Sequence, residues 1–165
     1  MLRPLGPEDL DALLEVQRVG AVAGLGHIFP QDTNPFPSEQ IRARWVEELN
    51  DPAVDCFVVL RDGEVAGFAA TRGAELLHFG TALDSWGSGL ADRAHEELLE
   101  HLRDRGHQRA WLRVFEENRR AVRFYERRGW RATSEATRTS FAPHPVLRRY
   151  ELDLIQASSA EHRLQ

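Results

Sequence analysis

The sequence predicts a single α/β domain in which a mixed central sheet carries helices on both faces. The length of 165 residues fits one domain. The first half of the chain carries a hairpin signal, and the second half alternates strand and helix patterns as β-α-β units do. The expected element order is β-α-α-β-β-β-α-β-α-β-β. We expect this domain to span residues 1–156 and a polar tail to follow over residues 157–165.

Composition and charge favour a soluble globular protein and narrow its partners. Apolar residues make up 42% of the chain and charged residues 28%, as in ordinary globular domains. No apolar run approaches the roughly 20 residues of a membrane span, and the start of the chain carries no secretory signal. We therefore expect a cytoplasmic protein with no membrane partner. The net charge of −5 argues against a general nucleic-acid partner.

Arginine supplies every basic side chain, 21 in all. The absence of lysine excludes a lysine Schiff base and a Walker-type phosphate loop, because both need the amine. Between Arg103 and Arg131 ten arginines stand against four acids. Two interpretations stay open for this segment, a solvated helical face and a site for a small polyanion such as a nucleotide phosphate.

The cysteine and histidine pattern predicts neither a disulfide nor a metal site. Cys56 is the one cysteine, and its apolar surroundings indicate a buried strand. His95, His101 and His107 recur every six residues, a spacing that does not keep them on one helix face. We expect them on a solvated helix surface and expect no bound metal.

The first half of the chain reads as two helices followed by a hairpin. Pro7 and the acids after it are typical of a helix start, and Ser38 is expected to cap the second helix. Asp62-Gly63 between apolar runs predicts a tight hairpin turn. In chain order the expected elements are a strand at Leu2–Leu5, a helix from Pro7 to about Val22, a loop at Gly24–Pro37, a helix from Ser38 to before Pro52, and strands at Cys56–Leu60 and Val65–Thr71.

The second half alternates strands with glycine-terminated helices. Gly106 and Gly129 each follow a helical pattern at the position where left-handed backbone ends a helix, and Asn118 is expected to cap the later helix. The expected elements are a strand at Glu75–Leu83, a helix after Gly87–Gly89, a strand at Ala110–Phe115, a helix at Asn118–Arg128, and strands at Trp130–Thr139 and Leu147–Leu154.

Two segments carry the chemistry. In the first, a strand ends, two glycines follow and a long helix begins, which aims free N–H groups and a positive helix end at one place. A phosphate is the natural ligand there, although a plain tight turn is the alternative. This segment is Thr81-Ala82-Leu83-Asp84-Ser85-Trp86-Gly87-Ser88-Gly89-Leu90-Ala91.

The second segment is the helix that begins after Asn118. Ala121 and Tyr125 share one helix face, so the small side chain lets a ligand lie against the helix while the tyrosine offers it a hydroxyl. Core packing is the alternative for Phe124 and Tyr125. The segment reads Asn118-Arg119-Arg120-Ala121-Val122-Arg123-Phe124-Tyr125-Glu126-Arg127-Arg128-Gly129-Trp130.

Together the two segments resemble the GNAT superfamily of N-acetyltransferases. The family's first signature is Arg/Gln-x-x-Gly-x-Gly/Ala, and the second is Asn-x-x-Ala-x-x-Phe-Tyr followed by Gly-Phe or Gly-Trp. The second is matched throughout, and the element order is similar to the family's fold with its mostly antiparallel sheet from Leu2 to Leu154. Trp86 departs from the first signature, and Thr81 and Leu83 stand where valine and proline are common.

The resemblance implies acetyl-CoA, or another acyl-CoA, as donor and no metal. Pantetheine would lie where the fourth and fifth strands splay, with its pyrophosphate on the N–H groups of Gly87–Ala91. Arg119, Arg120 or Arg123 would meet the 3′-phosphate. The residues implied in cofactor binding are Thr81, Ala82, Leu83, Trp86, Gly87, Ser88, Gly89, Leu90, Ala91, Asn118, Ala121, Phe124 and Tyr125.

The resemblance also implies direct attack by an amine in a ternary complex. Tyr125 would protonate the departing thiolate, and Glu75 is the expected base for the amine. His78 is a weaker candidate, expected on the opposite side of the pleat from Glu75. The acceptor would be a small-molecule or peptide amine, bound between the loops Gly24–Pro37 and Phe141–Val146. A homodimer is a family-level expectation.

Two other functions remain open from the sequence. The chain could be an acyl-CoA-binding regulatory module without catalysis, but such a module has no need of the Tyr125 hydroxyl. It could also be a toxin of the same fold that acetylates aminoacyl-tRNA, against which the acidic net charge argues.

Overall fold

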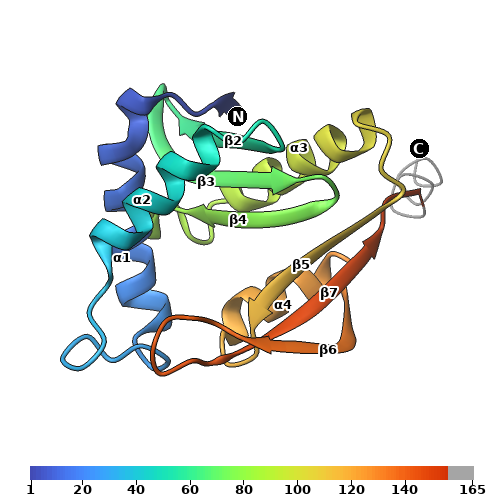
Figure 1. Cartoon of the computed structure of the whole chain (residues 1–165). Helices are drawn as coiled ribbons and strands as arrows, with labels where there is room; N and C mark the ends of the chain where they lie inside the picture. Colours follow the sequence, from blue (N-terminus) through green and yellow to red (C-terminus); the bar gives the residue numbers. More distant parts are fainter. Residues whose placement is uncertain (156–165) are drawn as a thin grey trace.

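The computed structural model describes residues 1–155 and has one seven-stranded sheet with the strand order β1-β2-β3-β4-β5-β7-β6 (Figure 1). Only the β4–β5 pair is parallel, and every other neighbouring pair is antiparallel. This confirms the predicted mixed, mostly antiparallel sheet and the predicted element order. The tail expected at 157–165, and the last residue of the expected domain, lie outside the described residues.

The helices and strands fall close to their predicted positions. The strands are β1 Leu2–Pro4, β2 Val54–Arg61, β3 Glu64–Arg72, β4 Glu75–Thr81, β5 Arg109–Phe115, β6 Arg131–Arg138 and β7 Val146–Asp153. The helices are α1 Leu10–Leu25, α2 Ser38–Leu49, α3 Leu90–Asp104 and α4 Arg119–Arg127. No helix within the described part of the chain is long and apolar enough to cross a bilayer.

Each face of the sheet packs against one pair of helices, which confirms helices on both faces. One core joins α1 and α2 to alternate residues of β2 and β3, and it contains Trp45, Cys56 and Phe68. The other joins α3 and α4 to β4, β5 and β7, and it contains Leu98, Leu112 and Trp130 among others. Alternate strand residues therefore belong to different cores, as the two-residue period of a strand requires.

Local sequence signals were reliable at several turns and caps. Asp62 and Gly63 adopt φ of 54° and 80°, the conformation of a type I′ hairpin turn, between β2 and β3. Asn118 caps α4, because its side-chain oxygen accepts from the Ala121 N–H at 3.2 Å. Gly106 and Gly129 adopt φ of 86° and 91° after α3 and α4, the left-handed ending that favours glycine.

Three predicted boundaries were wrong. β4 ends at Thr81 instead of Leu83, because the chain then turns through a short 3₁₀ helix at Leu83–Ser85 in which the Ser85 hydroxyl donates to the Ala82 carbonyl at 2.6 Å. α1 continues to Leu25, so the loop begins later than Gly24. Ser38 does not cap α2, since Pro37 occupies the N-cap position and Ser38 is already inside the helix.

Candidate active site

The strands β4 and β5 separate soon after they meet, and this splay organises the site. Within the described residues the two strands share only two register pairs, Glu75 with Trp111 and Leu76 with Leu112. Beyond Leu76 the two strands diverge in Figure 1, and the sheet opens into two halves. The β4 edge past this point has no strand partner on that side. The predicted splay of the fourth and fifth strands therefore occurs.

A bulge in β4 lies at the apex of the splay. Ala70 and Thr71 are consecutive on β3, but their β4 partners are His78 and Leu76. Leu77 is thus an extra residue in β4. Leu77 packs toward the core of α1 and α2, and His78 lies 4.9 Å from Trp45 of α2, between ring centroids. Two successive side chains therefore face the same side of the sheet.

This bulge overturns the expectation that His78 and Glu75 face opposite sides. Leu76 packs in the core of α3 and α4, so its neighbour Glu75 faces the α1–α2 side. His78 faces that side as well, because the extra residue shifts the alternation by one. The prediction assumed an unbroken pleat, and the sequence contains no signal that marks Leu77 as bulged.

The glycine turn that the sequence predicts as an anion cradle lies between β4 and α3. Gly87 and Gly89 have φ of 83° and 90°, which residues with a Cβ rarely adopt. Gly89 occupies the N-cap of α3. None of the described residues accepts a hydrogen bond from the main-chain N–H groups of Gly87, Gly89 and Ala91. Three unpaired donors at the positive end of a fifteen-residue helix have the geometry that suits an anion.

Trp86 connects the two sides of the splay. Its indole N–H donates to the Thr81 carbonyl at the end of β4 at 3.0 Å. The guanidinium of Arg120, on α4, lies 3.4 Å from the centre of a Trp86 ring, and Gly24 of α1 lies close enough that a Cβ there would contact the indole at 3.3 Å. Arg120 is therefore a stacking partner of Trp86 in this structure, while Arg119 and Arg123 form no ion pair with any described residue.

Tyr125 lies under the splay, in the core of α3 and α4. This core also contains Leu76 and Leu112, the last paired residues before β4 and β5 separate. The Tyr125 ring meets Phe124 and Trp130 edge-on, with centroids 5.4 and 5.7 Å away. Its hydroxyl forms no hydrogen bond with the described residues, and burial raises the pKa of that hydroxyl well above its usual value. Tyr125 thus remains a neutral donor at neutral pH.

The other predicted cofactor residues divide between surface and core. Ala121 is half-buried, and Asn118 is committed to capping α4. Leu90 is buried, and Phe124 packs 5.9 Å from Phe79 in the aromatic core. The side chains of Leu90 and Phe124 therefore serve packing. The last-strand Tyr150 is buried and donates to Glu126 at 3.2 Å.

Two acid-base pairs lie on the α1–α2 side of β4. Glu75 is 6% exposed and accepts from Arg113 of β5 at 3.2 Å. Nε2 of His78 lies 2.8 and 2.9 Å from the two carboxylate oxygens of Glu48, a residue of α2. Sequence reasoning missed Glu48, because nothing in an amphipathic helix pattern distinguishes this acid from its solvated neighbours.

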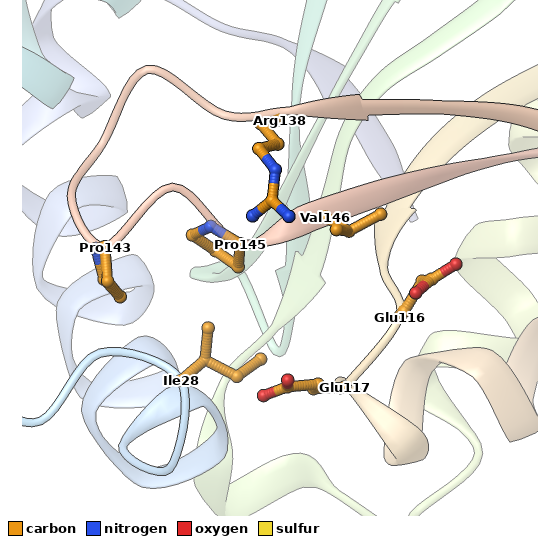
Figure 2. Close-up of a pocket in the computed structure, with 7 residues that line it drawn as sticks. All are labelled: Ile28, Glu116, Glu117, Arg138, Pro143, Pro145 and Val146. Atoms are coloured by element: carbon orange, nitrogen blue, oxygen red, sulfur yellow. The ribbon is translucent and has the colours of Figure 1, made fainter.

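The two loops expected to bind the acceptor meet at one cavity. Asn34, in the loop after α1, donates to the Ala142 carbonyl in the loop before β7 at 3.0 Å. The cavity between these loops and the end of β5 measures about 300 Å³ and is lined by Ile28, Glu116, Glu117, Arg138, Pro143, Pro145 and Val146. Figure 2 shows the carboxylate of Glu117 turned toward Ile28. Arg148 pairs with Glu116, whereas the Glu117 carboxylate has no partner among the described residues.

Histidine positions differ from the sequence expectation. His95 is fully buried, not on a solvated surface, because α3 turns it toward the aromatic core, where its Nε2 accepts from the Trp130 indole N–H at 3.0 Å. His101 pairs with Asp55 at 3.1 Å. Within residues 1–155, no three metal-ligating side chains gather into a group that could hold an ion.

Comparisons with known proteins give a family match and two kinds of relatives. The family model described as Acetyltransferase (GNAT) family matches residues 22–130. The chain is 38% identical over 97 residues to mycothiol acetyltransferase of Thermomonospora curvata, a match that covers 56% of this chain and 32% of that protein. It is 31% identical over 100 residues to an uncharacterised N-acetyltransferase of Mycobacterium tuberculosis, covering 58% and 64%. The matches thus span less than two thirds of these relatives' own lengths.

Solved structures share the fold at low identity. PaiA N-acetyltransferase from Thermoplasma acidophilum, in complex with coenzyme A, has a TM-score of 0.71 at 17% identity and covers 93% of this chain and 98% of its own. Ribosomal-protein-S18-alanine N-acetyltransferase from Escherichia coli has a TM-score of 0.68 at 20% identity and covers 93% of each chain. Spermidine N-acetyltransferase from Vibrio cholerae scores 0.70 at 16% identity and covers 95% and 96%.

Proposed function

The chain belongs to the GNAT acetyltransferase family, and from that premise we propose that it transfers an acyl group, with acetyl the simplest case, from coenzyme A to an amine. One observation carries the proposal. The β4–β5 splay combines an unpaired main-chain anion cradle at its mouth with the unpartnered Tyr125 hydroxyl in the core beneath it. A ligand with a phosphate end and a reactive thioester end matches that combination.

The donor would be held mainly by main chain. The pyrophosphate binds the N–H groups of Gly87, Gly89 and Ala91, and the pantetheine arm follows the free edge of β4 toward Thr81. Because main-chain donors make these contacts, Trp86 in place of an arginine or glutamine does not remove them. Arg119 and Arg123 are the arginines available to the 3′-phosphate, since Arg120 stacks on Trp86.

The reaction would proceed by direct attack of the amine on the thioester carbonyl. N–H groups at the β4 bulge stabilise the oxyanion, and Tyr125 donates to the departing sulfur. With ordinary pKa values of ~10 for a phenol and ~8.5 for a thiol, full transfer of the proton is uphill by about 2 kcal/mol. Burial raises the pKa of Tyr125 further, so this hydroxyl acts as a hydrogen-bond donor that releases its proton only as the carbon–sulfur bond breaks.

The acceptor would be an amine on a small molecule or a peptide. Relatives and fold neighbours are named for mycothiol, spermidine and a ribosomal-protein alanine, so their names do not converge on one acceptor. The cavity beside Ile28 and Pro143 combines apolar walls with the unpaired Glu117 carboxylate, which suits a cationic amine with an apolar part. The proposal places the protein in the cytoplasm, where acyl-CoA is available.

A thiol-release assay with acetyl-CoA and a panel of amines tests this function. Amine-dependent release of coenzyme A supports acyl transfer. Tight binding of acetyl-CoA in calorimetry, together with no release for any amine or aminoacyl-tRNA, would favour the regulatory binding module instead. No heat on titration with coenzyme A or its thioesters, in folded protein, would overturn donor binding altogether.

A further inference from the structure

His78 and Glu48 form a nearly buried pair that the reaction described so far does not use. Nε2 of His78 lies 2.8 and 2.9 Å from the two carboxylate oxygens of Glu48. The two side chains are 14% and 10% exposed. An ionised carboxylate only accepts hydrogen bonds, so this contact places a proton on Nε2 and leaves the lone pair on Nδ1.

The second ring nitrogen of His78 is accessible. Nδ1 bonds to none of the described residues, and it is not among the buried polar atoms that lack a partner, so it reaches solvent. The ring plane is held by Trp45 at 4.9 Å between centroids, and Trp45 donates to Gln17 at 2.8 Å. One nitrogen is therefore fixed on a carboxylate, while the other is free to accept a proton.

The pair lies at the apex of the splay. His78 comes two residues after Leu76, the last residue of β4 that pairs with β5, and directly after the bulged Leu77. It faces the α1–α2 side, the side of the Glu75–Arg113 pair, while Tyr125 packs in the core on the other side of the sheet. A thioester lying along the free edge of β4 would have the imidazole on one side and the phenol on the other.

We propose that Nδ1 of His78 accepts the proton of the acceptor amine, and that Glu48 is the positioning residue that holds the imidazole. This role rests on the proposed acyl transfer. An ammonium group gives one proton to Nδ1, and the free amine attacks the carbonyl carbon. The carbon–nitrogen bond forms and the carbon–sulfur bond breaks. As the amide forms, the amine nitrogen loses a second proton, which replaces the proton that Tyr125 donates to sulfur. The proton on His78 passes to solvent.

Glu75 is less suited to this step. Its carboxylate already balances Arg113 at 3.2 Å, so protonating it would leave that arginine facing a neutral group. A proton on His78 would instead lie beside the Glu48 carboxylate, on the ring nitrogen that no described residue engages. Glu75 and His78 face the same side of the sheet, so both are candidates for the same step. Substituting each one separately shows which of them the rate depends on.

Other charged groups around the pair do not replace it. Arg44, on α2, lies 4.0 Å from Glu48, and its Nε lacks a hydrogen-bond partner among the described residues. Burial lowers the pKa of Arg44, and the charge of Glu48 opposes that shift. On β2, burial raises the pKa of the Cys56 thiol to about 11, with the charge of Glu48 adding to it. Neither group is therefore a candidate to accept the proton of the amine at neutral pH.

The test measures coenzyme A release by His78→Gln, Glu48→Gln and Glu75→Gln against a panel of amines from pH 6 to 10. Glutamine at position 78 can still donate to Glu48 but cannot accept a proton. We expect His78→Gln to lower kcat/KM for the amine on the order of 10²-fold at neutral pH. The deficit should shrink toward pH 10, where solvent supplies the free amine, and Glu48→Gln should show a smaller loss with the same pH trend.

The matched control is His101→Gln, which removes another histidine paired with a carboxylate, Asp55. We expect it to leave the rate and its pH profile unchanged. Melting temperature and acetyl-CoA affinity are measured for every variant. Should His78→Gln fail to fold, His78→Ala with added imidazole and the Glu48→Gln profile carry the test.

The outcomes separate the two proposals. If the wild-type protein transfers acyl groups and His78→Gln keeps its rate and pH profile, the role of His78 is overturned while the proposed function stands. The role of His78 is also overturned if Glu75→Gln alone shows the pH-dependent loss. If the wild-type protein binds acetyl-CoA but acylates no amine, the proposed function fails, and the role of His78 fails with it.

Discussion

Two histidines, one packed against each face of the sheet, have opposite surroundings. His78 faces α1 and α2, bonds to the carboxylate of Glu48 and keeps Nδ1 accessible. His95 faces the aromatic core of α3 and α4, where Nε2 accepts from Trp130 and Nδ1 is buried without a hydrogen-bond partner among the described residues. Burial, with a smaller contribution from Arg103, lowers the pKa of His95 to about 4.

The difference shows how neighbours assign the two ring nitrogens: a carboxylate engages one nitrogen of His78 and leaves the other open, whereas burial among aromatic rings lowers the pKa of His95. A tryptophan packs beside each ring, Trp45 beside His78 and Trp130 beside His95. The acids beside them differ: Glu48 lies 2.8 Å from His78 and is nearly buried, whereas Glu96 lies 3.7 Å from His95 and its side chain is exposed. We therefore expect changes around His78 to alter rates, and changes around His95 to alter stability.

The largest expected effect is on the core side of the splay, at Tyr125. Tyr125→Phe removes the donor to the departing sulfur and should lower kcat on the order of 10²-fold or more. Stability should change little, because the hydroxyl has no partner among the described residues. Steady-state kinetics and thermal melting measure both. Tyr150→Phe is the control, since it loses a bond to Glu126 and should cost about 1 kcal/mol without affecting kcat. Equal kcat in the two variants would remove Tyr125 from the mechanism.

The second effect is on stability against acid. His95 has a folded pKa of about 4 against an ordinary value of 6.5, so its contribution is fully present above pH 6.5 and is lost as pH falls through 4. The shift corresponds to about 3 kcal/mol. Denaturant unfolding of wild-type protein and His95→Gln at pH 7 and pH 4.5 measures it. The variant should have a lower free energy of unfolding at pH 7 and lose less of it at pH 4.5. Equal losses in the two proteins would mean that other groups cause the acid sensitivity.

Trp130→Phe should come next, with an effect on stability alone. It keeps an aromatic ring in the core but removes the N–H that bonds to His95 Nε2, and leaving that buried nitrogen unpaired costs about 1–2 kcal/mol. Urea unfolding at pH 7 measures the loss. A tenfold fall in kcat with unchanged stability would contradict the structural role assigned to Trp130.

The smallest effect is expected from Trp45→Phe, the counterpart beside His78. It removes the bond to Gln17, costing about 1 kcal/mol, and it loosens the imidazole. We expect kcat to fall by a few-fold, with the greater loss below pH 8. Kinetics over the same pH range as for His78→Gln, with Trp130→Phe as the matched variant, would show whether a rate effect is confined to this face.

Much of the fold and part of the site could be read from local signals. The Asp62-Gly63 hairpin, the Asn118 cap and the glycines after α3 and α4 were predicted because each depends on the backbone preference of one or two residues. The glycine turn into α3 was predicted for the same reason. The burial of Cys56 and of Leu98 and its neighbours on α3 followed from strand and helix periodicity.

Long-range placement was harder to predict. His95 was expected on the surface, because six-residue spacing says nothing about which face of α3 meets Trp130. The Leu77 bulge reversed the predicted facing of His78, since one extra residue changes the side of every later side chain in a strand. Arg120 was one of three arginines predicted for the 3′-phosphate. Its stacking on Trp86 depends on how α4 packs against the splay, which the sequence does not show.

The amino-acid sequence alone determined the family, the element order and the two segments that form the cradle and hold Tyr125, because those features depend on residues close together in the chain. Tertiary structure decided that Glu48 meets His78, that Glu75 meets Arg113 and that two distant loops enclose a cavity. These contacts join residues about 30 or more positions apart. Their formation depends on strand register and helix packing, which no local pattern encodes.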